Sequence, residues 1–394
     1  MNKWRSQRLD RMGSSIFSEV SAWKNEARAR GVDVIPLDIG TPASPPSEEI
    51  RSALAKAAMS PDNYSYPGTL GTQRFRESAA RWFEHRFGVK LDPNREVLSL
   101  MGTQDGLSHL AMAITDPGDF ALLPDPGYPV YQAGLGAAGV ETVMLPLLEE
   151  NGYLPDFDAV PEEAWGRIKF MLLNYPSNPL SAVADLSLFE KLVDIARRRG
   201  VLLVHDNAYS ELAYGGFRPP SVLEVPGAKD VAIEFHSLSK SFHMAGARIG
   251  FAVGNPEVLK TLLQFKQNID FGVFHAVQEA AAVALERDMA GPQQASELYE
   301  PRRDLFIRAL REEGWDVPMP RATMFAWCPV PAGWSSRGFA QRLIEAEGVA
   351  VVPGNAFGER GEGYVRLAFI DSEERLLEAA RRIGRFLRSG ALPS

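Results

Sequence analysis

The chain has 394 residues, of which 45% are hydrophobic and 23% are charged. This composition excludes a disordered, collagen-like or coiled-coil chain, and the length predicts two domains or one large one. Its 42 lysines and arginines against 50 aspartates and glutamates give a net charge of −8, which argues against nucleic acid as the main partner because phosphate backbones bind basic surfaces.

The chain contains one cysteine, Cys328, so a fold built on intrachain disulfides is excluded. Cys328 lies in the apolar segment 325–330, which predicts a buried residue of a strand rather than a nucleophile. The first residues are charged, but no apolar run of about 7–15 residues follows them as in a signal peptide. No apolar run approaches the roughly 18 residues of a membrane-spanning helix. We therefore expect a cytoplasmic protein.

The middle of the chain alternates between short apolar runs and amphipathic stretches. Five apolar runs predict buried strands: 120–123, 169–173, 201–204, 231–235 and 248–253. Residues 185–199 predict a helix, because apolar residues recur there at helical spacing and Gly200 follows as a stop. Fully apolar strands separated by helices favour an α/β fold with a mainly parallel sheet covered on both faces.

The end of the chain has a different pattern, in which helices and strands are less regularly alternated. It predicts helices at 295–313, 337–347 and 372–387 and strands at 324–329, 349–352 and 364–369. This α+β pattern indicates a smaller domain, and we expect the N-terminal stretch to pack with it. The predicted division is a large domain at residues 38–285 and a small domain formed by residues 1–37 and 286–394.

Residues 134–139, with the sequence Gly-Leu-Gly-Ala-Ala-Gly, match the glycine spacing of a dinucleotide-binding loop. That fingerprint requires a strand before the glycines and a helix after them. Here a helical stretch precedes the glycines and a predicted strand at 141–145 follows, so we reject a nicotinamide site. The six histidines are scattered and no His-Glu-x-x-His motif is present, so a metal site has little support.

The most informative segment is 237–251, which follows a predicted strand and reads Ser-Leu-Ser-Lys-Ser-Phe-His-Met-Ala-Gly-Ala-Arg-Ile-Gly-Phe. It places Lys240 at the carboxyl end of a strand, where ligands bind in parallel sheets. Ser237, Ser239 and Arg248 could converge on one phosphate. A lysine beside a phosphate site suits a pyridoxal phosphate enzyme, because the lysine forms a Schiff base with the cofactor. The same pattern alone also fits a surface lysine in a polar loop.

Other polar residues follow predicted strands and favour the same chemistry. Asp206 could keep the ring nitrogen of the cofactor protonated, although a helix N-cap would also explain it. Asn178 and Tyr209 could hydrogen-bond the ring oxygen, and turn chemistry is the alternative for Asn178. The segment 101–106 opens a predicted helix whose first amides could bind phosphate. Tyr128 could stack on the pyridine ring.

These segments and their order resemble the class I pyridoxal phosphate aminotransferases of fold type I, from about Arg8 to the last helix. Within that family the chain resembles the branch of bacterial LL-diaminopimelate aminotransferases, which also holds alanine–glutamate transaminases. The stretches that carry this likeness are 124–131, 151–155, 174–179, 234–254, 268–272 and 348–369. The resemblance implies a transaminase whose large domain has a mainly parallel, seven-stranded sheet flanked by helices, beside a smaller α+β domain.

The resemblance also implies roles for individual residues. The residues implied to bind the cofactor are Tyr66, Gly102, Thr103, Gln104, Tyr128, Asn178, Asp206, Tyr209, Ser237, Ser239, Lys240 and Arg248. Of these, Lys240, Asp206 and Tyr209 are implied to be catalytic, with Lys240 as the Schiff-base lysine. Tyr66 resembles the tyrosine that reaches the cofactor phosphate of the partner subunit, which implies a homodimer with shared active sites.

Four residues are implied to contact the substrate. Arg366 matches the arginine that clamps the substrate α-carboxylate, and a guanidinium suits that task because it pairs with carboxylate in a two-pronged geometry. Gly40 matches the glycine whose backbone lies against the substrate. Ser15 lies where a substrate-contacting tyrosine is often found, and His275 falls near an asparagine position of the partner subunit.

The chain departs from the branch at several positions. Gln104 stands where lysine is common, Leu180 where threonine is usual, and Ala247 where tryptophan is usual. Together with Ser15 and His275, these departures leave the cofactor set otherwise intact. Gln104 removes one charged partner of the cofactor phosphate. The changes on the substrate side leave the amino donor open and put diaminopimelate itself in doubt.

The implied reaction moves an amino group from an L-amino acid to a 2-oxo acid, with 2-oxoglutarate and glutamate as one pair. One alternative is a C–S lyase on the same fold, which would release pyruvate and ammonia by β-elimination without an acceptor. A second alternative is a non-catalytic binding or regulatory protein. Loss of Lys240, Asp206 or Arg366 would have favoured it, and all three are present.

Overall fold

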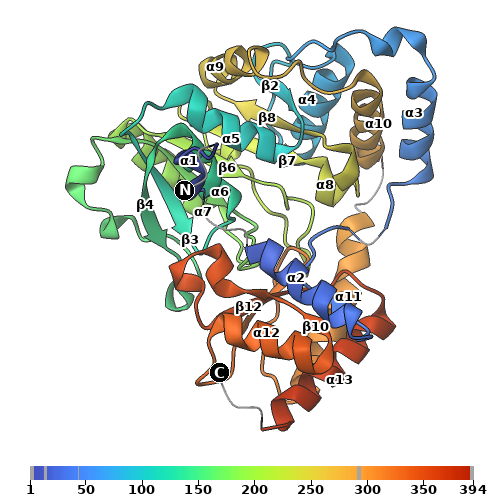
Figure 1. Cartoon of the computed structure of the whole chain (residues 1–394). Helices are drawn as coiled ribbons and strands as arrows, with labels where there is room; N and C mark the ends of the chain where they lie inside the picture. Colours follow the sequence, from blue (N-terminus) through green and yellow to red (C-terminus); the bar gives the residue numbers. More distant parts are fainter. Residues whose placement is uncertain (1–3, 13–15, 43, 291–293, 391–394) are drawn as a thin grey trace.

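The computed structural model describes residues 4–12, 16–42, 44–290 and 294–390. A large body built around one sheet lies beside a smaller body formed mainly by the C-terminal part of the chain (Figure 1). The helices are α1 Arg8–Arg11, α2 Ile16–Ala29, α3 Glu48–Ala58, α4 Gln73–Phe87, α5 Thr103–Ile114, α6 Val130–Ala138, α7 Leu186–Arg199, α8 Leu238–Ser241, α9 Pro256–Gln267, α10 His275–Ala290, α11 Gln294–Glu312, α12 Ser336–Glu347 and α13 Glu373–Arg388.

The large sheet has seven strands in the order β2-β8-β7-β6-β5-β3-β4. Its strands are β2 Val97–Leu100, β3 Phe120–Asp125, β4 Glu141–Pro146, β5 Ile168–Asn174, β6 Leu202–Asp206, β7 Ala232–Ser237 and β8 Gly250–Gly254. Strands β4, β3, β5, β6 and β7 pair in parallel, whereas β8 is antiparallel to both β7 and β2. The predicted mainly parallel, seven-stranded sheet is confirmed. Strand β8 begins two residues later than predicted, because Arg248 has a left-handed φ of 54°.

Both faces of this sheet are covered by helices, as the apolar strands predict. On β5, Met171 and Leu173 belong to one core cluster and Phe170 and Leu172 to another. This alternation follows from the strand, in which successive side chains point to opposite faces. Helices α4, α7 and α10 supply the first cluster, and α5, α6 and α9 supply the second. The carboxyl ends of β5, β6 and β7 face β12 (Tyr364–Ala368) of the smaller body across a cavity.

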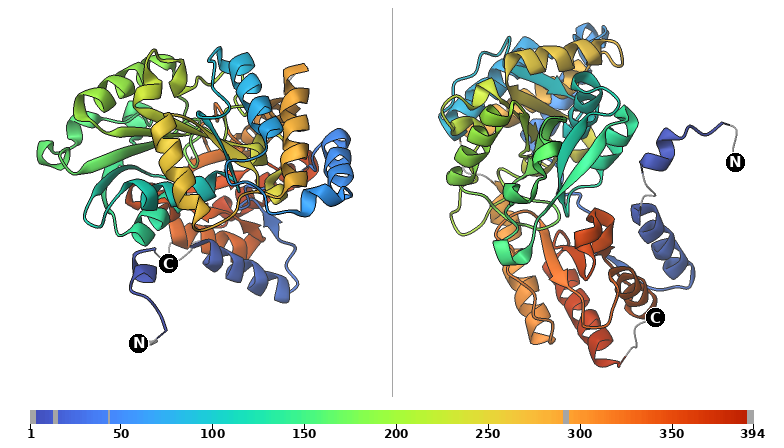
Figure 2. Two further views of the ribbon diagram at one scale, coloured as in Figure 1. Left: turned by 90° about the horizontal axis from the view of Figure 1, so that it is seen from above. Right: turned by 90° about the vertical axis from the view of Figure 1, so that its left-hand side faces the viewer.

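The smaller body contains a three-stranded antiparallel sheet in the order β11-β12-β9. Its strands are β9 Phe325–Pro329, β11 Val352–Pro353 and β12 Tyr364–Ala368, and the two-residue strand β1 Ile35–Pro36 pairs in parallel with β10 Val349–Ala350. Helix α2 packs against α12, as Figures 1 and 2 show in blue and orange. The N-terminal stretch therefore contacts the C-terminal part, while the exact division into domains stays a prediction.

Two local predictions have a clear outcome in the fold. Gly134 and Gly136 lie inside α6, and Gly139 ends that helix with a φ of 76° before β4, so these glycines do not form a strand-to-helix loop. Cys328 lies on β9 and is completely buried, and this burial raises the pKa of its thiol. Across the described ranges, no helix is both long enough and apolar enough to cross a lipid bilayer.

Candidate active site

A cavity of about 600 Å³ lies where the carboxyl ends of β5, β6 and β7 face α2, the segment 38–41 and β12. It brings together most of the site residues that the sequence predicts. Those that line it are Gly40, Thr103, Gln104, Tyr128, Asn178, Asp206, Tyr209, Ser237, Ser239, Lys240, Arg248 and Arg366. Their convergence from distant parts of the chain makes this cavity the candidate active site.

Lys240 lies on the short helix α8, which starts directly after β7. The hydroxyl of Ser237 caps that helix by accepting a hydrogen bond from the Ser239 amide at 3.1 Å. The Lys240 ammonium donates to the carbonyl oxygen of Gly40. Burial, together with the positive charges of Arg366 and Arg248, lowers the pKa of Lys240 to about 8. Far more of this amine is therefore neutral at neutral pH than of an ordinary lysine, and a nucleophile or proton acceptor must be neutral.

Asp206 is the last residue of β6, and its side chain is buried at the bottom of the cavity. Its Oδ2 accepts a hydrogen bond from the Tyr131 hydroxyl at 2.7 Å. Its Oδ1 has no hydrogen-bond partner among the described residues. Burial raises the pKa of Asp206, and the Tyr131 hydrogen bond opposes that rise. The carboxylate thus keeps one buried oxygen for a ligand that can donate a proton or a hydrogen bond.

A buried network lies behind Asp206. The Nε2 of His205 is 2.9 Å from the Tyr175 carbonyl oxygen, which can only accept, so this nitrogen donates. The Nδ1 of His205 is 2.8 Å from Oε2 of Glu234, and Nε2 of His236 is 2.6 Å from Oε1. Burial raises the pKa of Glu234, but the two imidazoles outweigh it and bring that pKa well below its ordinary value. The charge of His205 also lowers the pKa of Asp206.

The first turn of α5 and Arg248 form a cradle for an anion. Gly102 precedes the helix with a φ of 79°, and a Cβ on it would lie 2.5 Å from Nη2 of Arg248. A Cβ on Gly250 would lie 2.7 Å from the His236 carbonyl oxygen and 3.4 Å from the Thr103 amide. The two glycines therefore let the guanidinium and the helix start approach closely. Free amides at a helix N-terminus beside a guanidinium suit a phosphate.

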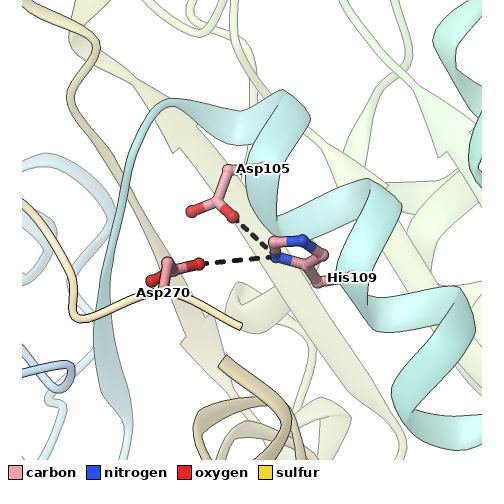
Figure 3. A group of neighbouring side chains, drawn as sticks. All are labelled: Asp105, His109 and Asp270. Carbon is pink, nitrogen blue, oxygen red and sulfur yellow. Dashed lines mark ion pairs between the residues drawn. The ribbon is translucent and has the colours of Figure 1, made fainter. Parts of the chain in front are cut away.

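A charged group of Asp105, His109, Asp270 and Lys266 lies at the start of α5, and Figure 3 shows the first three of these residues. The Nδ1 of His109 is 2.7 Å from Oδ1 of Asp105 and 3.8 Å from Oδ2 of Asp270. The ammonium of Lys266 lies 2.5 Å from Asp105 Oδ2 and 2.9 Å from Asp270 Oδ2. Although burial raises the pKa of Asp105, His109 and Lys266 lower it below its ordinary value. These carboxylates already have a cation, so the group is a poor candidate for a metal ion.

Arg366, on β12, is buried on the opposite side of the cavity. Its Nη1 donates to Asn178 Oδ1 at 2.7 Å, and its Nη2 donates to the Asp38 carbonyl oxygen at 3.0 Å. Its guanidinium carbon lies 4.1 Å from the centre of the Phe325 ring. Burial lowers the pKa of Arg366 to about 10, so the group stays cationic at neutral pH. A buried guanidinium held in this way can pair with a carboxylate that enters the cavity.

Three of the predicted residues that the structure describes do not line the cavity. Gly102 lies beside it, against Arg248. Tyr66 is 84% exposed and packs against Phe271 at 5.1 Å between ring centres, and His275 begins α10. Ser15 lies outside the described residues. The roles of Tyr66 and His275 in the site of a partner subunit stay predictions.

The structure adds residues that the sequence analysis missed. Asn174 ends β5, and its Nδ2 donates to the Asp206 carbonyl oxygen at 2.7 Å while its Oδ1 accepts from the Asn178 amide at 2.7 Å. The sequence could have predicted Asn174 from its position at the end of a strand. It could also have predicted Tyr131 from its position one helical turn after Tyr128. Lys24 and Asp38 also line the cavity as an ion pair, and no sequence signal links them.

Pyridoxal phosphate requires an amine, a partner for its ring nitrogen and a phosphate site, and the cavity offers all three. Lys240 supplies an amine of lowered pKa, and Asp206 supplies a buried oxygen without a partner among the described residues. Arg248 and the start of α5 supply the anion cradle, in which Gly102 leaves the space. The residues present therefore fit this cofactor.

The family model described as "Aminotransferase class I and II" matches residues 32–383. The chain is 45% identical over 379 residues to LL-diaminopimelate aminotransferase 2 of Nostoc sp. strain PCC 7120, covering 96% of this chain and 97% of that protein. It is 43% identical over 382 residues to the LL-diaminopimelate aminotransferase of Moorella thermoacetica, covering 97% and 98%.

Solved structures agree with these relatives. The substrate-bound structure of BacF from Bacillus subtilis superimposes with a TM-score of 0.94 at 33% identity, covering 98% of each chain. A probable N-succinyldiaminopimelate aminotransferase from Thermus thermophilus has a TM-score of 0.89 at 43% identity, covering 94% of this chain and all of that one. The chain therefore belongs to the class I and II aminotransferases, and its cofactor for amino-group transfer is pyridoxal 5'-phosphate.

Proposed function

We propose that this aminotransferase transfers the amino group of a diaminopimelate-type amino acid to a 2-oxo acid, with 2-oxoglutarate as the acceptor. The observation that carries the chemistry is that Lys240, Asp206 and Arg366 line one cavity. The choice of amino donor is supported by relatives at 43–45% identity that are named as LL-diaminopimelate aminotransferases. Their likeness spans nearly the whole chain, so it includes the cavity.

We propose that Lys240 anchors the cofactor and moves the proton of the reaction. Its neutral Nζ would accept the proton from the substrate α-carbon and give it up to the cofactor rather than back to the α-carbon. A pKa of about 8 keeps Nζ in range for both accepting and donating this proton. Asp206 would keep a proton on the ring nitrogen through the oxygen that has no partner among the described residues. Asn178 and Tyr209 would hydrogen-bond the ring oxygen. When bound, pyridoxal phosphate supplies the electron sink that stabilises negative charge at the α-carbon.

The remaining predicted residues would hold the cofactor and the substrate. Seven of them would bind the phosphate or the ring, namely Gly102, Thr103, Gln104, Tyr128, Ser237, Ser239 and Arg248. Arg366 would bind the substrate α-carboxylate, since its guanidinium is buried and its Nε has no partner among the described residues. Gly40 would lie against the substrate because it lines the cavity, and a side chain there would clash with the Phe325 ring, which a Cβ would approach to 2.8 Å.

We further propose a homodimer in which Tyr66 reaches the phosphate site of the partner subunit. Large hydrophobic side chains are exposed on neighbouring segments of the large body, and these are Tyr64, Tyr66, Ile269 and Phe271. The two segments pack together through the rings of Tyr66 and Phe271. An exposed apolar patch of this kind is typical of a subunit interface. Light scattering should give twice the chain mass, and Tyr66→Phe should weaken cofactor binding without changing that mass.

A spectral screen of single half-reactions tests the reaction type and the donor. Cofactor-loaded enzyme is mixed without acceptor with LL-diaminopimelate, glutamate, alanine, aspartate, methionine or an aromatic amino acid. Loss of the absorbance of the aldehyde form, with one equivalent of 2-oxo acid, identifies a transaminase and its donor. Unchanged absorbance with steady release of pyruvate and ammonia would identify a C–S lyase instead.

A further inference from the structure

The charged pair Lys24 and Asp38 lines the cavity beside Arg366. Helix α2 presents Phe17, Ser21 and Lys24 to the cavity at helical spacing. The ammonium of Lys24 lies 2.6 Å from Oδ2 of Asp38, and the side chains are only 9% and 7% exposed. None of the roles proposed above uses this pair. Buried charges in a cavity wall need an explanation, because removing them from water is costly.

The hydrogen bonds of this pair are incomplete. Asp38 Oδ1 is buried and has no hydrogen-bond partner among the residues that the structure describes. Lys24 has three donors on its ammonium, and within the same residues its hydrogen bond goes to Asp38 Oδ2. The pair therefore offers one acceptor and further donors to a ligand. An unsatisfied buried carboxylate oxygen costs free energy, which a ligand with a matching donor would recover.

The position of the pair relates it to the α-carboxylate site. Leu37 donates to the Ala350 carbonyl and accepts from the Ala368 amide, which holds the following residue, Asp38, beside β12. The carbonyl of Asp38 then accepts a hydrogen bond from Arg366 at 3.0 Å. One residue thus contacts Arg366 through its backbone and Lys24 through its side chain. An amino acid held at Arg366 shares its cavity with this pair.

We propose that Lys24 and Asp38 form the subsite for the distal end of a long substrate that ends in both a carboxylate and an ammonium group. Lys24 binds the distal carboxylate, and Oδ1 of Asp38 accepts from the distal ammonium. A diamino dicarboxylic acid has this second dipolar end. This inference rests on the proposed function, because it assumes that Arg366 binds the α-carboxylate.

A purely structural ion pair would have different consequences. If the pair only fastened α2 to residue 38, its loss would disturb the binding of every amino acid to a similar degree. A distal subsite affects only substrates that reach it. The distinction can be measured with three amino acids: LL-diaminopimelate, L-2-aminopimelate, which has the same length but lacks the distal ammonium, and L-alanine, which has no distal group.

The experiment measures the apparent dissociation constant of each amino acid in single half-reactions of cofactor-loaded enzyme. Lys24→Met should weaken both seven-carbon acids about tenfold or more and leave alanine within about twofold, because a charged hydrogen-bond partner is lost. Asp38→Asn should weaken LL-diaminopimelate by a similar factor and L-2-aminopimelate much less. Lys191→Met and Asp194→Asn, at exposed positions of α7, are the matched controls and should change nothing.

The double variant Lys24→Met/Asp38→Asn covers the case in which a single variant leaves an unpaired buried charge and fails to fold. It should fold, keep its affinity for alanine and lose its preference for the seven-carbon acids. Equal losses for all three amino acids, or no loss for any, would overturn the subsite while leaving the proposed function intact. Wild-type enzyme that converts alanine or glutamate but neither seven-carbon acid would overturn the proposed donor and the subsite together.

Discussion

Two sides of the cavity are built in different ways. We call the side with Asn174, Asp206 and Lys240 the floor, and the side with Lys24, Asp38 and Arg366 the rim. The floor is formed by residues at the ends of neighbouring parallel strands, and the sheet register places Asn174 of β5 directly beside Asp206 of β6. The rim joins segments from opposite ends of the chain, and the hydrogen bond between Arg366 and Asp38 spans 328 positions. The floor is therefore fixed by one sheet, whereas the rim depends on how the smaller body packs against it.

This difference separates chemistry from selectivity. Lys240 and Asp206 sit on the floor, where parallel strands direct ligands to their carboxyl ends. Arg366, Lys24 and Asp38 sit on the rim, where a small change in packing moves a charge relative to the substrate. Changes on the floor should therefore remove the reaction or the fold, and changes on the rim should alter affinity.

The largest expected effect comes from Lys240→Ala on the floor. The substitution removes the group that we propose anchors the cofactor and moves the proton, so turnover should fall by more than about 10⁴-fold. Steady-state transamination by cofactor-loaded protein measures this effect. Lys191→Ala, an exposed lysine on α7, is the control. Multiple turnovers by the Lys240 variant at a comparable rate would refute its role.

The next largest effect concerns the support of the floor rather than its surface. Glu234 is completely buried and accepts hydrogen bonds from Ser221 Oγ and the Val222 amide in addition to its contacts with His205 and His236. Glu234→Gln should lower the free energy of unfolding by about 3 kcal/mol, since breaking a buried charge pair leaves its partners uncompensated.

Urea unfolding of the variant and the wild type measures this loss, and Glu190→Gln at an exposed position of α7 is the control. The sign of the pH dependence can be checked as well. The pKa of Glu234 is lower in the folded protein than in the unfolded chain. The stability that its carboxylate contributes is therefore fully present above the unfolded pKa and is lost as the pH falls toward the folded pKa. A variant as stable as the wild type at neutral pH would contradict this role.

A smaller effect is expected on the rim. Arg366→Lys keeps the charge but removes the planar pair of donors that now reach Asn178 and Asp38. Affinity for amino acids should fall by about 2 kcal/mol, or roughly 30-fold. The rate at which the enzyme with bound amino acid completes the half-reaction should change less. Half-reaction titrations separate the two quantities. Arg385→Lys on α13 is the control, and unchanged affinity for the Arg366 variant would sink the assignment.

The same contrast explains how much could be predicted from the sequence. The parallel part of the sheet and the strand-end residues of the floor followed from apolar runs that end in polar motifs, as at Asp206 and Lys240. The seven-stranded sheet followed from the family resemblance, because no apolar run predicted β2. Arg366 was found through a family resemblance, and nothing in its own surroundings marks it. Lys24 and Asp38 escaped notice because a contact between a helix and a loop leaves no periodic signal. Side-chain contacts that depend on packing between two bodies are visible only in three dimensions.

The smallest effect links the rim to the floor through the charge of Arg366. Only the neutral amine of Lys240 can attach the cofactor, so the rate at which apoprotein captures pyridoxal phosphate should rise with pH and level off above about pH 8 instead of 10.5.

Burial is the largest cause of this lowered pKa of Lys240, and the positive charge of Arg366 is the next. Arg366→Gln removes that positive charge, so the pKa of Lys240 should rise and the midpoint should move to higher pH by less than about one unit. Stopped-flow capture rates across the pH range measure the shift, with Arg385→Gln as the control. An unchanged midpoint would show that Arg366 does not act on Lys240 through its charge, and the floor and the rim would then be electrostatically independent.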